Sequence, residues 1–392
     1  MVPLRRRSAT SLIRWTRRDT LLGLVASAIG ASAPRAQTPD RPLVGALRWD
    51  AWYAPGSEPT MAVERSLAPP RYQSRLPFFA YPAAGNQMLL PALTPSVLQL
   101  EIEQALYAGL DFWAFVAYPR ESPMSVALNQ YLAARPLPRI RFCLFTALEY
   151  WGSANASSPL IGEHVALMRH KSYVRTPDGR PIYFLGFVTA SKANDRWRGL
   201  SGLRAGVDAF RSRATAAGAG NPYVVLCGTP RDVVGWVGVL NPDAVGAYAI
   251  SDGRGVGDYA ALTRIVEALW QMLASAGVPV VPTVMSGWDR RPRVEHPVPW
   301  EHGQQPGAGL EYHFDMPQPQ ELTAHLRRAF TWIADQPPQR KAPVALIYAW
   351  NENDEGGWLV PTIPCNTERL EALRAALAAD QSGRSPGCRL VP

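Results

Sequence analysis

The sequence has little charge and no long apolar run, and these absences exclude several classes of protein. Only 18% of its 392 residues are charged, which is low for a coiled coil or a helical repeat. No segment reaches the roughly 18 consecutive apolar residues of a membrane-spanning helix, so no stable span is expected in the mature chain. The 37 prolines and 31 glycines show no triplet period, which excludes a collagen-like chain. The 47% of hydrophobic residues still supplies a packed core.

Motifs that mark common enzyme classes are also missing. The six histidines show neither H-x-H nor H-E-x-x-H spacing, so a zinc site is not expected. There is no G-x-S-x-G element, no P-loop, and no G-x-G-x-x-G between a strand and a helix. We therefore expect neither a metal ion nor an organic cofactor.

Most of the net positive charge lies at the N-terminus. Residues 1–36 carry seven arginines and one aspartate, which account for six of the eight net positive charges. The nearly neutral remainder gives no reason to expect a nucleic-acid partner. The pair Arg17–Arg18 precedes a weakly apolar run of 13 residues that ends at Ala33, too short to span a bilayer. Small residues follow, so cleavage is expected after Ala33 or Ala36.

These features predict a twin-arginine-type export signal over residues 1–36. The expected partner of this segment is the twin-arginine export machinery, and the expected location of the mature chain is periplasmic or secreted. A basic tail or an uncleaved anchor is the alternative.

The four cysteines fall into two kinds. Cys143 and Cys227 each lie inside an apolar run, which is typical of small core residues. Cys365 and Cys388 flank the last predicted helix and could pair in an oxidising compartment. A helix over 367–380 is about 21 Å long and the return over 381–388 spans at most about 26 Å, so a disulfide is sterically allowed. Free thiols remain the alternative.

Residues 37–392 alternate short β-branched or aromatic runs with amphipathic segments. Eight predicted strands alternate with eight predicted helices. This number predicts a single-domain α/β fold, a (β/α)8 TIM-type barrel, rather than an open doubly wound sheet. The predicted strands cover 43–48, 111–117, 140–146, 181–187, 222–228, 243–249, 279–285 and 343–349. The predicted helices cover 94–109, 123–134, 161–171, 201–217, 229–240, 257–276, 319–335 and 367–380.

Long loops follow strands one, seven and eight, and in a barrel they lie on the C-terminal face where active sites form. Broad aromatic faces around a concave site suit the C–H face of a sugar ring, although bulky aromatics can also simply plug a barrel mouth. Seven tryptophans directly follow predicted strands: Trp49, Trp52, Trp151, Trp288, Trp300, Trp350 and Trp358.

The densest polar cluster follows the eighth strand, where Glu352, Asp354 and Glu355 stand within four residues. Carboxylates placed close together in a partly dry site have their pKa values pushed apart, which yields one proton donor and one base. Cleavage of a glycosidic bond needs such a pair. We therefore predict that Glu352 and Glu355 are catalytic, with a solvated acidic turn as the alternative.

Further substrate-binding candidates follow six of the strands. An Asp–Arg pair within residues 286–293 can hold hydroxyl groups or a carboxylate through forked hydrogen bonds, although a surface ion pair is the alternative. The full set is Trp49, Asp50, Trp52, Tyr53, Tyr118, Glu149, Trp151, Tyr248, Trp288, Asp289, Arg293, Trp350, Asn351 and Trp358.

The order of these motifs resembles glycoside hydrolase family 99, the endo-α-mannosidase-like barrels, and the related WbsX-like domains of polysaccharide gene clusters. The resemblance spans roughly residues 43–375. It is carried by the W-x-x-W-Y segment at 49–53, by 109–113 entering the second strand, by Gly287-Trp288-Asp289 through Pro292-Arg293, and by Trp350-Asn351-Glu352 with Glu355-Gly356.

The resemblance implies that both glutamates of the N-E-x-x-E element are catalytic. Glu352 would assist attack by the sugar's own 2-hydroxyl to give a 1,2-anhydro sugar, and Glu355 would be the general acid and later the base. Asn353 stands where the family usually has an aromatic residue, which bears on the substrate class. The expected activity is cleavage of an α-linked polysaccharide or oligosaccharide with retention. The alternative is a non-hydrolytic glycan-binding or polysaccharide assembly protein associated with glycosyl transfer in the cell envelope.

Overall fold

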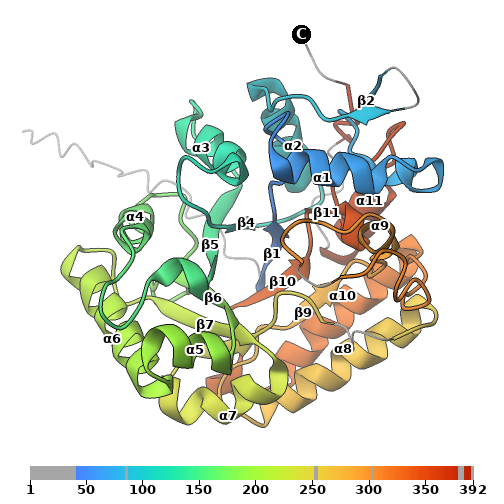
Figure 1. The fold of residues 1–392 in the computed structure, drawn as a ribbon. Coiled ribbons are helices and arrows are strands. Elements are labelled where there is room, and N and C mark those ends of the chain that lie inside the picture. The colour runs from blue at the N-terminus through green and yellow to red at the C-terminus, as the bar shows by residue number, and fades with distance from the viewer. Residues whose placement is uncertain (1–40, 84–86, 251–254, 302–303, 378–383, 390–392) are drawn as a thin grey trace, which may run out of the picture. The chain divides into compact units, whose positions relative to one another are not determined.

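The computed structural model describes residues 41–83, 87–250, 255–301, 304–377 and 384–389. The predicted export segment, residues 1–36, lies outside the described residues. Eight parallel strands form the central sheet in the order β8-β7-β6-β5-β4-β1-β10-β9 (Figure 1). They are β1 (Leu43–Arg48), β4 (Phe112–Val116), β5 (Arg141–Ala147), β6 (Ile182–Val188), β7 (Tyr223–Gly228), β8 (Ala244–Gly246), β9 (Thr283–Met285) and β10 (Val344–Tyr348).

The two edges of this sheet meet and close a barrel. The backbone N–H of Val245 in β8 donates to the carbonyl of Pro279 at 2.9 Å, and Val281 N–H donates to the carbonyl of Val245 at 2.8 Å. Pro282 has no N–H to give to a ladder, so the seventh predicted strand splits into a bridge at Val280 and β9. The predicted (β/α)8 barrel is confirmed, and the open doubly wound sheet is excluded.

Helices cover the outside of the barrel (Figure 1). All eight predicted helices are present, although the predicted end of the last one, 378–380, lies outside the described residues. Thr94 caps the first of them as expected, because its hydroxyl accepts from Val97 N–H at 3.2 Å. The helices are α2 (Pro95–Tyr107), α3 (Val126–Ala133), α4 (Leu160–Leu167), α6 (Leu200–Ala216), α7 (Pro230–Leu240), α8 (Tyr259–Ala274), α10 (Pro319–Ala334) and α11 (Glu368–Leu377). In the described part of the chain, no helix has the length and apolar character needed to cross a membrane.

Several short elements were not predicted, and most of them lie in loops at the C-terminal ends of the strands. After β1 the chain forms α1 (Glu58–Leu67), η1 (Pro70–Arg75) and the hairpin β2 (Tyr81–Pro82) with β3 (Met88–Leu89). After β5, β6 and β9 it forms η4 (Leu148–Trp151), α5 (Ala190–Trp197) and α9 (Arg291–Glu295). After β10 it forms β11 (Asn351–Glu352), η6 (Asn353–Glu355) and β12 (Gly357–Trp358). η3 (Pro123–Ser125) leads into α3, and η5 (Pro338–Arg340) precedes β10.

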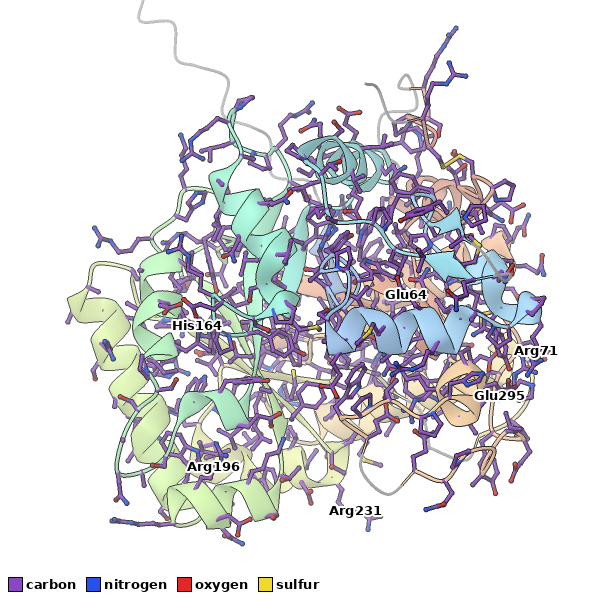
Figure 2. All side chains as sticks on the ribbon, turned by 45° about the horizontal axis from the view of Figure 1, so that its top comes forward. Glu64, Arg71, His164, Arg196, Arg231 and Glu295 are labelled. Carbon is purple, nitrogen blue, oxygen red and sulfur yellow. A yellow bond between two sulfur atoms is a disulfide. The ribbon has the colours of Figure 1, made fainter. Side chains whose placement is uncertain are left out.

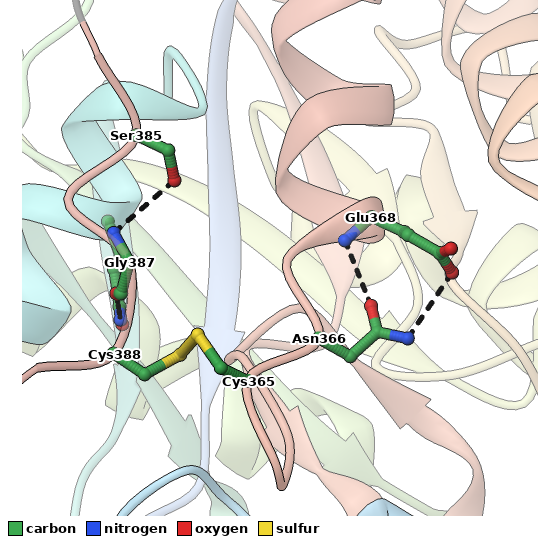
Figure 3. The surroundings of a disulfide bond; sticks show 7 residues. Cys365, Asn366, Glu368, Ser385, Gly387 and Cys388 are labelled. Atoms are coloured by element: carbon green, nitrogen blue, oxygen red, sulfur yellow. Dashed lines mark hydrogen bonds between the residues drawn. A yellow bond between two sulfur atoms is a disulfide. The ribbon is translucent and has the colours of Figure 1, made fainter.

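A disulfide joins Cys365 to Cys388, with 5.7 Å between their Cα atoms (Figure 3). It ties the segment that ends the described chain to the start of α11. The same segment contacts α2, since Gln104 Nε2 donates to the carbonyl of Gly387 at 2.7 Å. Cys143 and Cys227 are buried and free, as expected of core residues.

Candidate active site

Glu352 and Glu355 open onto a cavity of about 420 Å³ at the C-terminal end of the barrel. This is the face on which barrel enzymes place their catalytic groups. The wall comes from loops after β1, β4, β5, β6, β8, β9 and β10. Besides the two glutamates, the lining residues are Trp49, Pro59, Val116, Tyr118, Met124, Ala147, Glu149, Tyr150, Phe187, Lys192, Tyr248, Arg293, Trp300 and Glu301.

A tight hairpin after β10 presents both glutamates. Asn351 pairs with Trp358 and Glu352 pairs with Gly357 in the antiparallel ladder of β11 and β12. Gly356 closes the turn with φ +87°, and a Cβ there would collide with the backbone of Asp289. The turn therefore requires glycine, and it brings the two carboxyl groups to the same side of the hairpin.

One arginine joins the acidic side chains of this hairpin. Arg293 on α9 donates from Nη2 to Glu352 Oε2 at 3.0 Å, from Nε to Asp354 Oδ2 at 2.7 Å, and from Nη1 to Glu355 Oε1. Burial alone would lower the pKa of Arg293, but the three carboxyl groups raise it well above its ordinary value. Its guanidinium also lies 4.9 Å from the ring centroid of Trp49. Arg293 is therefore a fixed positive charge at the floor of the cavity.

Glu352 is the member of the pair whose surroundings favour the protonated form. Burial and the negative charge of Glu355 raise the pKa of Glu352 to about 8, although Arg293 opposes the shift. The Tyr248 hydroxyl donates to its Oε1. A carboxyl group in this state can donate a proton to a leaving group.

Glu355 is the member of the pair whose surroundings favour the carboxylate form. Burial would raise the pKa of Glu355, but the positive charges of Arg293 and Arg290 outweigh burial and hold the pKa below its ordinary value. Arg290 Nε donates to its Oε1 at 3.1 Å, and the Tyr348 hydroxyl donates to its Oε2. The cavity thus contains one proton donor and one base side by side.

Ion pairs fix the short helix α9 that carries Arg293. Arg71 of η1 pairs with Glu295, and these two side chains lie next to each other in Figure 2. Tyr72 also donates its hydroxyl to Glu295 at 2.6 Å. Arg75, at the end of η1, donates to the carbonyl of Asp289 at 3.0 Å. The position of Arg293 therefore depends on a segment more than two hundred residues earlier in the chain.

A second buried network holds the hairpin from the β1 side. Asn351 accepts from Trp49 N–H at 2.8 Å and donates to Asp50 at 3.2 Å. Arg48 donates from Nε to the same carboxyl oxygen at 2.8 Å. Burial raises the pKa of Asp50 to about 6, even though Arg48 opposes the shift. The side chain of Asn351 thus anchors the hairpin to the loop after β1, immediately before Glu352, and does not line the cavity.

Of the fourteen predicted substrate-binding residues, the structure brings Trp49, Tyr118, Glu149, Tyr248 and Arg293 into the wall of the cavity. The other nine do not line this cavity. They are Asp50, Trp52, Tyr53, Trp151, Trp288, Asp289, Trp350, Asn351 and Trp358.

The contacts of three of these nine residues lie away from the cavity. Trp350 is fully buried, and its Nε1 donates to Glu101 at 3.0 Å. Trp151 is likewise buried and donates to the Tyr183 hydroxyl at 2.8 Å. Asp289 forms ion pairs with Arg75 of η1 and with Arg291 of α9, and the second of these is an Asp–Arg pair within the predicted motif. A position just after a strand does not specify which way its side chain faces.

Several residues of the site were not among the candidates. Tyr150 lies between two predicted residues, and Tyr348 opens the acidic motif itself, so proximity to those motifs could have found them. Phe187 belongs to β6 and Lys192 to α5, in a segment whose sequence has no cluster of acids or tryptophans. Among the described residues, no group of three or more His, Cys, Asp or Glu side chains is arranged to hold a metal ion.

Solved structures with the same architecture include one described as a glycoside hydrolase-like protein. It matches this chain with a TM-score of 0.53 at 12% identity, over 89% of this chain and 97% of that chain. The fold is similar to that of a glycoside hydrolase-like protein. The GH99 endo-alpha-mannosidase from Bacteroides thetaiotaomicron gives a TM-score of 0.48 at 11% identity, over 85% of this chain and 95% of that chain. No family model and no curated protein matches the sequence.

Proposed function

We propose that this chain is an exported glycoside hydrolase that cleaves an α-linked polysaccharide or oligosaccharide with retention. The observation that carries the proposal is the pair Glu352 and Glu355, which open onto one cavity and whose pKa values are shifted in opposite directions. Glycoside hydrolysis requires one carboxyl group as acid and one as base or nucleophile. The aromatic walls at Trp49 and Tyr118 offer apolar faces to a sugar ring.

The charge state supports one division of roles between the two glutamates. Glu352, which keeps its proton, acts as the general acid, and Glu355, which is ionised, acts as the base. This order is the reverse of the one that the family resemblance implies. It follows from the contacts of each group, because Glu355 accepts from two guanidinium groups whereas Glu352 accepts from one.

In the first step, Glu352 gives its proton to the glycosidic oxygen while the C1–O bond breaks. The substrate's 2-oxygen attacks C1, and Glu355 takes the 2-hydroxyl proton, which leaves a 1,2-anhydro sugar. In the second step, water attacks C1 and gives a proton to Glu352, while Glu355 returns its proton to the 2-oxygen. Two displacements at C1 retain the anomeric configuration, and both glutamates return to their starting states.

Aryl α-glycosides with two different leaving groups test both the activity and the roles. A 2,4-dinitrophenyl leaving group needs little protonation, whereas an unactivated phenyl group needs an acid. We expect Glu352→Gln to lose cleavage of the phenyl glycoside but to keep the first step, release of dinitrophenol, from the dinitrophenyl glycoside. Steady turnover should then be limited by the second step, because glutamine cannot take the proton of the attacking water. Glu355→Gln should lose cleavage of both glycosides. Glu103→Gln is the control, because Glu103 is exposed on α2 and contacts Gln99.

The opposite pattern would restore the roles that the resemblance implies. Equal turnover in wild type and both variants would exclude this pair as the catalytic groups. A wild-type protein that binds a glycan but hydrolyses none would favour the alternative of a non-hydrolytic glycan-binding or assembly protein.

A further inference from the structure

Phe187 is the exposed residue of β6, a strand that is otherwise buried. The other six residues of β6 are buried, whereas Phe187 is 39% exposed. Among the described residues that line the cavity, it alone is a large apolar side chain with this degree of exposure. An apolar ring left open to solvent inside a concave site is typical of a ligand contact rather than of the core.

The backbone at Phe187 is held in an uncommon conformation. Its φ is +52°, in the left-handed region that bulky residues rarely adopt. The pairing of β6 with β7 shifts register between Leu185 and Val188, so Phe187 falls outside the regular ladder. Gly186 lets the Phe145 ring pass directly beneath, where a Cβ would collide with it. Such strain persists where surrounding structure imposes it, and it clusters at ligand sites.

The ring of Phe187 lies beside the catalytic pair. Its centroid is 4.9 Å from that of Tyr248, whose hydroxyl donates to Glu352. Lys192 Nζ lies 5.9 Å from the same ring centroid and forms an ion pair with Glu149. Both members of this pair are partly exposed, at 33% and 40%. An apolar face and a polar edge therefore stand together next to the acid.

We propose that Phe187, Lys192 and Glu149 form a sugar-binding subsite adjoining the catalytic glutamates. The C–H face of a pyranose stacks on the Phe187 ring, and its hydroxyls bond to Lys192 and Glu149. The sugar is neutral, because Lys192 is already neutralised by Glu149 and leaves no unpaired cation there for an acidic sugar. This inference rests on the proposed function and adds the class of sugar bound next to the cleaved bond.

Phe187→Gly separates binding from packing. Glycine accepts the left-handed backbone freely, so this variant should be at least as resistant to thermal unfolding as the wild type. Loss of the stacking face should raise KM for an α-linked oligosaccharide by about two- to tenfold, with a smaller change in kcat. Phe187→Trp should restore the wild-type KM. Met272→Ala, which removes an exposed apolar side chain on α8, should change neither value.

An unchanged KM in Phe187→Gly would overturn the subsite while leaving the proposed hydrolysis intact. A large loss of stability with unchanged KM would assign Phe187 to packing instead. If the wild type hydrolyses none of the α-linked oligosaccharides tested, the hydrolase proposal fails. Calorimetric binding of the same oligosaccharides then decides the subsite, with weaker binding by Phe187→Gly supporting it and equal or absent binding refuting it.

Discussion

Replacement of Arg293 by methionine should destabilise the protein in a way that depends strongly on pH. Methionine keeps much of the side-chain volume but removes the charge that Glu352, Asp354 and Glu355 share. Arg293 is 4% exposed, so water cannot replace it fully. Removal of one partner from a buried ion pair costs about 3–5 kcal/mol of unfolding free energy, because the remaining charges stay buried without compensation. We expect a loss of this size at pH 8.

The loss should shrink as the pH falls. In the wild type, the pKa of Glu355 is lowered, so its contribution to stability is present at neutral pH and disappears only as the pH falls through that low value. Without Arg293, the pKa of both glutamates should rise, and protonation then relieves the repulsion. Over the pH range in which the folded variant binds one more proton than the folded wild type, the difference in unfolding free energy between them shrinks. It shrinks by up to about 1.4 kcal/mol for each unit by which the pH falls.

Urea unfolding followed by tryptophan fluorescence at pH 8, 6.5 and 5 measures this difference. Arg204→Met is the matched control, because Arg204 forms a partly exposed pair with Asp208 on α6. The control should lose less than about 1 kcal/mol at every pH. Equal losses of unfolding free energy in the two variants would show that Arg293 does not stabilise the three carboxyl groups. A loss in Arg293→Met that does not change with pH would show the same.

Three further predictions concern other parts of the molecule. Tyr248→Phe removes a hydrogen bond that lowers the pKa of Glu352, so the alkaline limb of the pH–rate profile, expected near pH 8 for the wild type, should move to higher pH. The double variant Cys365→Ser/Cys388→Ser should lose about 3 kcal/mol of unfolding free energy, measured in urea, because the disulfide closes a loop with a sequence separation of 23. Replacement of Arg17–Arg18 by two lysines should stop export, and mass spectrometry of the wild-type periplasmic protein should show cleavage after position 33 or 36.

Much of the barrel could be predicted because its signals are local. Each strand is an apolar run buried on both faces, and caps such as Thr94 mark helix ends within a few residues. The acid cluster at 352–355 was found for the same reason, since its members are adjacent in the chain. Short elements such as α5 and α9 were missed because they are only eight and five residues long and lie in loops between the predicted elements.

The geometry of the site could not be predicted because it depends on contacts between distant segments. The sequence placed Asp289 and Arg293 in one motif, but only the packing of α9 shows that Arg293 turns towards the hairpin after β10. The order of protonation in the glutamate pair likewise depends on which arginines and tyrosines reach each group. The sequence shows that the tryptophans follow strands, but it does not show which way each side chain faces. Trp350, a predicted substrate contact, is an example, because its side chain packs in the core.

The release of reducing ends from polysaccharides tests most directly whether Glu352 and Glu355 catalyse glycoside hydrolysis. The purified mature chain and its Glu355→Gln variant would be incubated with a panel of α-mannans, α-glucans and bacterial exopolysaccharides. We expect the wild type to release new reducing ends from at least one α-linked polymer. The variant should be equally folded by circular dichroism and should release none. Equal release by both proteins, or no release by the wild type from any polymer, would contradict this expectation.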